Sequence, residues 1–225
     1  MESLERVSTH YKDRSAAAYF RKQQRLTEIK GKLNSRKFAA YVDSGDSVVD
    51  FGCGDGGLLA RLNACEKVGV DVNPWNREAA AARGVRTVEF AEELPSESAD
   101  VVISNHALEH TLHPLEELRR MHARLKPNGR LVIYLPVDDW RIQKSYRPND
   151  PNHHLYTWTP LLFGHLLAEA GFRVVDSRVV HHAWPGRLTP MAARLPKRLF
   201  GWVMIASAFA TRRRELCALA TRRSG

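Results

Sequence analysis

A glycine-rich turn is the first place in this sequence where a ligand could bind. Residues 50–57 read Asp-Phe-Gly-Cys-Gly-Asp-Gly-Gly and join an apolar run to a segment with helical spacing. Gly52 and Gly54 allow a tight turn and a close approach of a ligand to the backbone, and a following helix would offer unpaired N–H groups. The G-x-G-x-x-G match, completed by Gly57, fits a dinucleotide or another adenosine-containing cofactor.

Two carboxylates narrow this choice. Asp71 ends the second predicted strand beside the loop, where it can accept hydrogen bonds from the ribose hydroxyls of an adenosine. Asp50 precedes the glycines, and a carboxylate there would repel a pyrophosphate but suit the ammonium of a methionine group. Asp50 therefore disfavours a nicotinamide dehydrogenase.

A second group of reactive side chains follows the fourth predicted strand. His106, Glu109 and His110 form an H-x-x-E-H pattern, which on a helical turn presents all three side chains to one side. His153 and His154 follow the fifth predicted strand, and in a parallel sheet both segments reach the rim where ligands bind. A neutral imidazole can accept a proton from a hydroxyl or amine, so each of these four histidines is a candidate general base.

Short apolar runs that alternate with helical segments predict where these residues lie. Strands are expected at residues 47–51, 67–71, 85–90, 100–104, 130–135, 172–180 and 215–221. Helices are expected at residues 15–41, 57–63, 75–83, 115–125 and 160–170. This order predicts βαβ units on a parallel sheet, with an N-terminal helical cap at residues 1–40 and one catalytic domain at residues 41–225.

Four ordered motifs resemble those of the class I S-adenosylmethionine-dependent methyltransferases. They lie at residues 48–56, 69–71, 99–110 and 125–133, and the resemblance covers roughly residues 41–180. It implies a Rossmann-like α/β methyltransferase fold, with a mainly parallel seven-stranded sheet flanked by helices, and methyl transfer from S-adenosylmethionine. The cofactor-binding residues expected from it are Asp50, Gly52, Gly54, Asp71, Val72, Phe90, Ala91, Glu92, Asn105 and Tyr19.

The end of the third predicted strand departs from the family pattern. Relatives often place an acid there to hold the adenine amino group, but Phe90 stands at that position. Stacking by Phe90 and a contact from Glu92 are the two substitutes that we expect.

The same resemblance suggests a metal. Some class I O-methyltransferases bind a divalent ion through E-x-x-E-H after the fourth strand, and here His106 replaces the first Glu. A site made of His106, Glu109, His110 and His154 would favour zinc, iron, cobalt or manganese over magnesium. In the alternative, the site holds no metal and one histidine is the base. A metal is not required, because methyl transfer depends mostly on the alignment of donor and acceptor.

Residues 184–214 are predicted to be a basic, apolar insertion before the last strand. Their apolar part, residues 199–210, is shorter than the roughly 20 residues that cross a bilayer. Together with the cations of residues 197–214, it could make a peripheral membrane contact with Trp202 and Phe209 in the interface. A helix packed on the domain as a lid or dimer surface is equally compatible with the pattern.

The formal charge of +9 is concentrated at the two ends of the chain. The net charge is +6 over residues 1–40, −5 over residues 41–184 and +8 over residues 185–225, so an anionic partner would meet the ends. Three cysteines without a C-x-x-C pair and a polar, acid-containing N-terminus favour a cytoplasmic protein. Peripheral binding at the inner membrane surface is compatible with this location.

The substrate class is left open by these patterns. The leading hypothesis is O-methylation of a small molecule, a sugar or a glycan/lipid-linked substrate. An RNA methyltransferase is less favoured because no RNA-binding module is recognisable, although the basic ends support it. A non-catalytic cofactor-binding or scaffold protein is disfavoured by the histidine cluster. The oligomeric state is not predicted.

Overall fold

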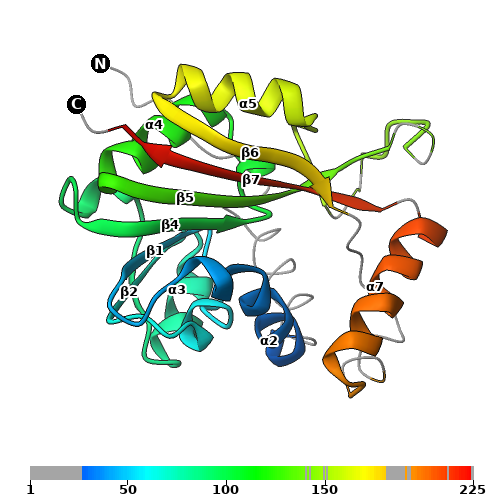
Figure 1. The fold of residues 1–225 in the computed structure, drawn as a ribbon, viewed down its shortest axis with the longest axis horizontal. Coiled ribbons are helices and arrows are strands. Elements are labelled where there is room, and N and C mark those ends of the chain that lie inside the picture. Colours follow the sequence, from blue (N-terminus) through cyan, green and yellow to red (C-terminus); the bar gives the residue numbers. More distant parts are fainter. Residues whose placement is uncertain are drawn as a thin grey trace.

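A single sheet of seven strands organises the part of the chain that the computed structural model describes, which is residues 27–139, 141, 143–148, 150, 152–180, 191, 194–211 and 213–223. The strand order is β3-β2-β1-β4-β5-β7-β6 (Figure 1). The strands are β1 Ser47–Phe51, β2 Glu66–Val70, β3 Arg86–Val88, β4 Ala99–Asn105, β5 Leu125–Val137, β6 Phe172–Val180 and β7 Arg214–Arg222. Strand β7 runs antiparallel to β5 and β6 and the other strand pairs are parallel, so the expected mainly parallel, Rossmann-like α/β sheet is confirmed.

Helices cover both faces of this sheet, with α4 and α5 on one side and α2 and α3 on the other (Figure 1). The helices are α2 Thr27–Phe38, α3 Pro74–Ala81, α4 Pro114–Arg124, α5 Pro160–Glu169 and α7 Lys197–Thr211. Alternate residues of β1 belong to the two cores, since Val49 packs in the cluster of Leu118 and Phe163, while Val48 packs in the cluster of Phe38. The period of two in a strand is the reason for this alternation.

Capping residues place the helices close to the predicted positions. The Asn73 side chain accepts a hydrogen bond from the Trp75 N–H at the start of α3, and the Thr159 hydroxyl accepts one from the Leu162 N–H at the start of α5. Gly171, at a φ of +96°, ends the segment that contains α5. The predicted sixth strand then follows with its expected bounds.

The helix predicted at residues 57–63 is wrong. Only the 3₁₀ turn η3, Leu59–Arg61, forms between β1 and β2. Gly56, at a φ of +72°, cannot belong to an α-helix, and the next residue is again a glycine, so too few residues remain for a stable helix. Lys67 donates to the carbonyls of Ala60 and Leu62 and thereby satisfies the end of the turn.

Other boundaries shift by a few residues. Strand β5 begins at Leu125 rather than at residue 130, because the Lys-Pro-Asn-Gly cluster continues the strand past a register irregularity at Ala99 and Val101 of β4. The predicted N-terminal helix, residues 15–41, is described from Thr27 onward, where α2 is followed by the 3₁₀ turn η2, Ala39–Tyr41. The earlier part lies outside the described residues.

The predicted insertion contains α7, which packs its inner side against α2. Phe200 and Met204 are buried in a small cluster with Leu33, and Ile29 packs at its edge. In the part of the chain described, no helix combines the length and the apolar character needed to span a membrane.

Candidate active site

The glycine loop (residues 52–57) is held in place by Asp71. Asp71 Oδ2 accepts a hydrogen bond of 2.8 Å from the Gly54 N–H. Its Oδ1 accepts 2.9 Å and 3.1 Å bonds from the Asn73 N–H and the Asn76 side-chain amide. Because a carboxylate offers about four acceptor sites, about one remains for a ligand.

The two glycines that begin the loop have different surroundings. A Cβ added to Gly52 would lie 2.2 Å from Ala107 Cβ, so this glycine is needed where the loop touches the segment after β4. A Cβ added to Gly54 would have no atom within 4 Å. Both residues have a positive φ, which glycine adopts without strain. Open space above Gly54 leaves its backbone accessible to a ligand.

A cleft extends from this loop along the carboxyl ends of β1 to β4. Its walls are mostly apolar, with a few polar groups that could orient a ligand. It is lined by Phe51, Gly52, Gly54, Val70, Asp71, Val72, Asn73, Asn76, Glu89, Phe90, Ala91, His106, Ala107, His110, Thr111 and Glu117.

Asp50 lies beneath the loop and is almost completely buried. Its Oδ1 has no hydrogen-bond partner among the residues described. Burial, reinforced by the charge of Asp71, raises the pKa of Asp50 to about 8. A buried carboxyl with a free acceptor atom fits a cationic or hydrogen-bond-donating group of a ligand, such as an ammonium.

An acid does stand at the end of β3, contrary to the expectation from Phe90. Because β3 ends at Val88 and not at residue 90, the first residue after the strand is Glu89, which lines the cleft beside Phe90. Arg77 Nη2 lies 3.2 Å from Glu89 Oε2, and the backbone N–H groups of Glu89 and Phe90 both donate to Glu93 Oε1. The predicted strand boundary was wrong, and it concealed this acid.

The segment after β4 carries the histidine rim (His106, Glu109, His110 and His154), to which the loop after β5 contributes His154. Glu109 lies in the 3₁₀ turn η5, Leu108–His110, is fully buried, and neither of its carboxylate oxygens has a hydrogen-bond partner among the residues described. Its Oε1 lies 3.7 Å from His110 Nε2 and 4.0 Å from His154 Nε2. Glu109, His110 and His154 therefore offer three potential metal-ligand atoms within 4.8 Å of one another.

The environment shifts the pKa values of these groups in different directions. Burial, followed by the charge of His154, lowers the pKa of His110 to about 3, so this ring is neutral at physiological pH. Burial raises the pKa of Glu109. Burial opposes the charged form of His154 as well, but a 2.8 Å contact between its Nδ1 and Asp138 Oδ2, with the charges of Asp138 and Glu109, raises its pKa overall.

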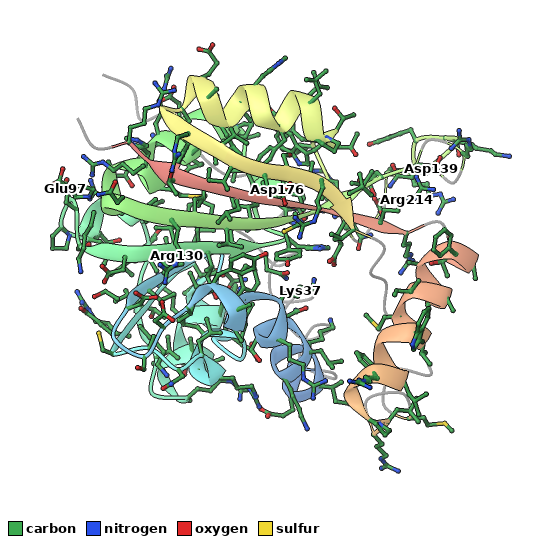
Figure 2. The ribbon with its side chains drawn as sticks, viewed as in Figure 1. Lys37, Glu97, Arg130, Asp139, Asp176 and Arg214 are labelled. Carbon is green, nitrogen blue, oxygen red and sulfur yellow. The ribbon has the colours of Figure 1, made fainter. Side chains whose placement is uncertain are left out.

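His106 contacts a different carboxylate. Its Nε2 lies 3.0 Å from Glu215 Oε1, at the start of β7, and its backbone has a φ of +56°. Lys37 Nζ lies 2.8 Å from both Glu215 oxygens and donates to Asn105 Oδ1 at 3.3 Å. Figure 2 shows Lys37 between α2 and the end of β4. The structure thus groups three of the four predicted metal ligands and leaves His106 outside that group.

Comparison with known proteins identifies the family. The sequence profile of the methyltransferase domain matches residues 19–177, which is most of the chain. The chain belongs to the class I S-adenosylmethionine-dependent methyltransferases. A solved S-adenosylmethionine-dependent methyltransferase of Thermotoga maritima has the same fold, with a TM-score of 0.64 and 18% identity over 96% of this chain and 99% of that one.

Two curated methyltransferases match shorter stretches. The ubiquinone biosynthesis O-methyltransferase of Bradyrhizobium diazoefficiens is 34% identical over 122 residues, which are 47% of this chain and 48% of that protein. The ribosomal protein L11 methyltransferase of Cupriavidus metallidurans is 31% identical over 129 residues, or 48% of this chain and 42% of that protein. The chain spans about half, or less, of the length of the curated relatives that it matches.

Most of the residues expected to bind the cofactor of this methyltransferase line the cleft, but some do not. Asp50 lies below it, Glu92 pairs with Arg120 at 2.6 Å, and Asn105 accepts from Lys37. Tyr19 lies outside the described residues. Of the four histidines, His106 and His110 line the cleft, while His154 lies behind His110 and the backbone of His153 hydrogen-bonds to His110.

Some residues that contact the loop or the rim were not singled out from the sequence. The Asn-Pro pair before α3 is a local capping signal that could have placed Asn73 near Asp71. Lys37 and Glu215 are 178 residues apart, and no local pattern links them.

Proposed function

We propose that this protein transfers a methyl group from S-adenosylmethionine to a hydroxyl of a small molecule, a sugar or a glycan/lipid-linked substrate. The observation that carries the proposal is His106, a potential base on the wall of the same cleft that the glycine loop and Asp71 form. A relative named as an O-methyltransferase supports oxygen as the acceptor. S-adenosylmethionine, when bound, supplies an electrophilic methyl group.

The chain's own residues would hold this cofactor by its two ends. Asp71 retains about one acceptor site for a ribose hydroxyl, and Asn76 must move if both hydroxyls are to be accepted. Asp50, with a free acceptor atom, suits the ammonium of the methionine end. Glu89 lines the cleft beside Phe90, after β3, where it can accept a hydrogen bond from the adenine amino group.

His106 is the histidine best placed to act as a base. When its Nε2 donates to Glu215, its Nδ1 keeps a lone pair that can accept the proton of a hydroxyl. His110 shares the cleft, but a pKa of about 3 makes it a weak proton acceptor. Glu215 fixes the orientation of the ring, and Lys37 neutralises that carboxylate in its buried position.

A divalent metal is a second candidate, favoured by the buried, unpartnered carboxylate of Glu109. His154 directs Nε2 toward Glu109 while Asp138 contacts its Nδ1, an arrangement typical of histidine ligands held by a second carboxylate. With His110, these residues could hold a transition metal. Such an ion would supply a Lewis acid for the acceptor hydroxyl.

Calorimetry with S-adenosylhomocysteine tests the cofactor assignment. We expect binding in the micromolar range and a loss of at least ~1.5 kcal/mol in Asp71→Ala, the scale of hydrogen bonds to a charged group. The control Asp176→Ala removes an acid of β6 and should leave the affinity unchanged. Tight binding of NAD without any response to S-adenosylhomocysteine would overturn the proposal.

An assay of methyl transfer from labelled cofactor to fractionated cell extract distinguishes the mechanism with a histidine base from the mechanism with a metal. If His106 is the base, chelator has no effect and His106→Ala causes the largest loss of transfer. If a metal acts, chelator abolishes transfer and a first-row transition metal restores it better than magnesium. Glu109→Gln and His154→Ala then lose activity and bound metal together, as elemental analysis of untagged protein would report.

A further inference from the structure

Helix α7 is apolar on two opposite sides. Its inner side, with Phe200 and Met204, is buried against α2. Its outer side exposes a stripe at helical spacing, in which Leu199 is 54%, Trp202 70%, Ile205 39% and Phe209 62% exposed. The packing of the helix on the domain therefore accounts for one apolar side and leaves the other in solvent, which is uncommon for a contiguous patch with two large aromatic rings.

Cations surround this outer stripe. Arg194 and Arg198 precede it, Arg213 and Arg214 follow it, and all four are exposed. In the sequence, residues 184–214 contain seven Lys or Arg and no Asp or Glu. The surface is thus complementary to a partner that is both apolar and anionic.

The position of α7 places this surface beside the active site. Arg214 begins β7, and Glu215, the next residue, contacts His106 on the wall of the cleft. Figure 1 shows α7 beyond the end of the sheet that carries the loop after β5, and Figure 2 shows Arg214 and Asp139 at that same end. A partner bound to α7 would therefore lie near the carboxyl ends of the parallel strands.

We propose that α7 binds the surface of an anionic lipid bilayer, with Leu199, Trp202 and Phe209 in the interface and the flanking arginines at lipid phosphates. An apolar stripe that contains Trp and is flanked by Arg has the composition typical of an interfacial helix. A second copy of the chain fits less well, because a symmetric contact would bring the same arginines together. The link to a lipid-linked acceptor rests on the proposed function, but the membrane contact itself does not.

Sedimentation with lipid vesicles tests the contact directly. The full chain should bind vesicles that contain phosphatidylglycerol and bind pure phosphatidylcholine at least about tenfold more weakly, because the arginines contribute only on the anionic surface. Trp202→Ser/Phe209→Ser should weaken binding to the anionic vesicles about tenfold or more, and Arg198→Gln/Arg213→Gln should weaken it while leaving the apolar stripe intact.

A matched control lies on α5. Leu161 and Leu162 are 68% and 60% exposed, as open to solvent as Trp202 and Phe209, but residues 151–172 of the sequence contain no Lys or Arg. Leu161→Ser/Leu162→Ser should bind vesicles as the unmodified chain does. Equal losses in the two double variants would show a general effect of surface hydrophobicity and overturn the proposal.

Two further outcomes would also overturn it. One is that the unmodified chain fails to bind anionic vesicles. The other is that light scattering shows a dimer which Trp202→Ser dissociates in the absence of lipid, because a second copy then covers the stripe. Affinity for S-adenosylhomocysteine is measured on the same samples and should be equal in all variants. If the unmodified chain does not bind S-adenosylhomocysteine, the proposed function is refuted, but the vesicle result still holds.

Discussion

The glycine loop and the histidine rim face the same cleft but are built differently. The loop is held by Asp71, and both come from one short stretch that runs from the end of β1 to the residue after β2. The rim is assembled from side chains after β4 and β5, and its His106 depends on Glu215 of β7 and Lys37 of α2. The geometry of the loop thus depends on neighbouring residues, whereas that of the rim depends on the packing of distant segments.

Each region contains a buried carboxylate with unpartnered oxygen among the residues described: Oδ1 of Asp50 beside the loop, and both oxygens of Glu109 in the rim. An unpartnered buried carboxyl is expensive to ionise, so each is a place where a cation would bind favourably. The two regions therefore underlie two separate proposals, an ammonium at Asp50 and a metal ion at Glu109.

The largest expected effect is at Asp50. Because burial and then Asp71 raise its pKa to about 8 from an ordinary value of 3.8, its stabilising contribution is full below 3.8, declines as the pH rises, and is lost above about 8. Asp50→Asn should therefore stabilise the cofactor-free protein by up to about 5 kcal/mol near pH 9 and by little near pH 4, as measured by urea unfolding. It should also weaken S-adenosylhomocysteine binding.

Asp100 provides a control of opposite sign. Burial opposes its ionisation, but hydrogen bonds from Lys126 and the Ser47 N–H lower its pKa overall, so Asp100→Asn should destabilise the protein at neutral pH and lose this effect in acid. If the difference in the free energy of unfolding between Asp50→Asn and the unmodified protein stays constant with pH, Asp50 is not protonated in the folded state at neutral pH.

The next largest effect concerns the buried pair of Lys37 and Glu215, whose side chains are 6% and 5% exposed. Lys37→Met removes a cation from the buried Glu215 and should lower the free energy of unfolding by about 3–5 kcal/mol, and Lys37→Met/Glu215→Gln should recover part of this loss. Arg119→Met, which breaks an exposed pair with Glu116, should cost about 0.5 kcal/mol or less. Equal effects of the two single variants would contradict the importance of burial here.

A smaller effect is expected in the glycine loop. Gly52→Ala combines a left-handed φ with a 2.2 Å approach to Ala107 Cβ, and should destabilise the protein by about 2–4 kcal/mol. Gly54→Ala carries only the backbone strain and should cost about 1–2 kcal/mol. The double variant Gly52→Ala/Ala107→Gly should then resemble Gly54→Ala in thermal unfolding, and a failure of this rescue would mean that strain rather than contact dominates.

The sequence predicted the loop region better than the rim, for physical reasons. Strand alternation, the glycine turn and the acid after β2 are local patterns, and they predicted the sheet and the position of Asp71 correctly. The same local reasoning failed at residues 57–63, where a 3₁₀ turn forms in place of the predicted helix. It also failed at β3, which ends before Glu89 and not at residue 90. The contact of Lys37 with Glu215 depends on the packing of α2 beside β7, which no local pattern specifies.

The smallest expected effect concerns one hydrogen bond of the rim, between His154 and Asp138, and its pH dependence is opposite to that of Asp50 beside the loop. His154 Nδ1 lies 2.8 Å from Asp138, and although burial opposes its charge, this bond and the nearby carboxylates raise the pKa above 6.5. The resulting stability is full below 6.5 and is lost as the pH rises through the folded-state pKa. Asp138→Asn should therefore cost about 1 kcal/mol near pH 6 and less near pH 9 in chelator-treated protein. Its deficit shrinks toward zero with rising pH, whereas the gain of Asp50→Asn grows from zero. If adding a transition metal back removes this pH dependence, His154 is a metal ligand, and the rim holds a metal cation as Asp50 would hold an ammonium. If the pH dependence persists, the base at His106 remains the better mechanism.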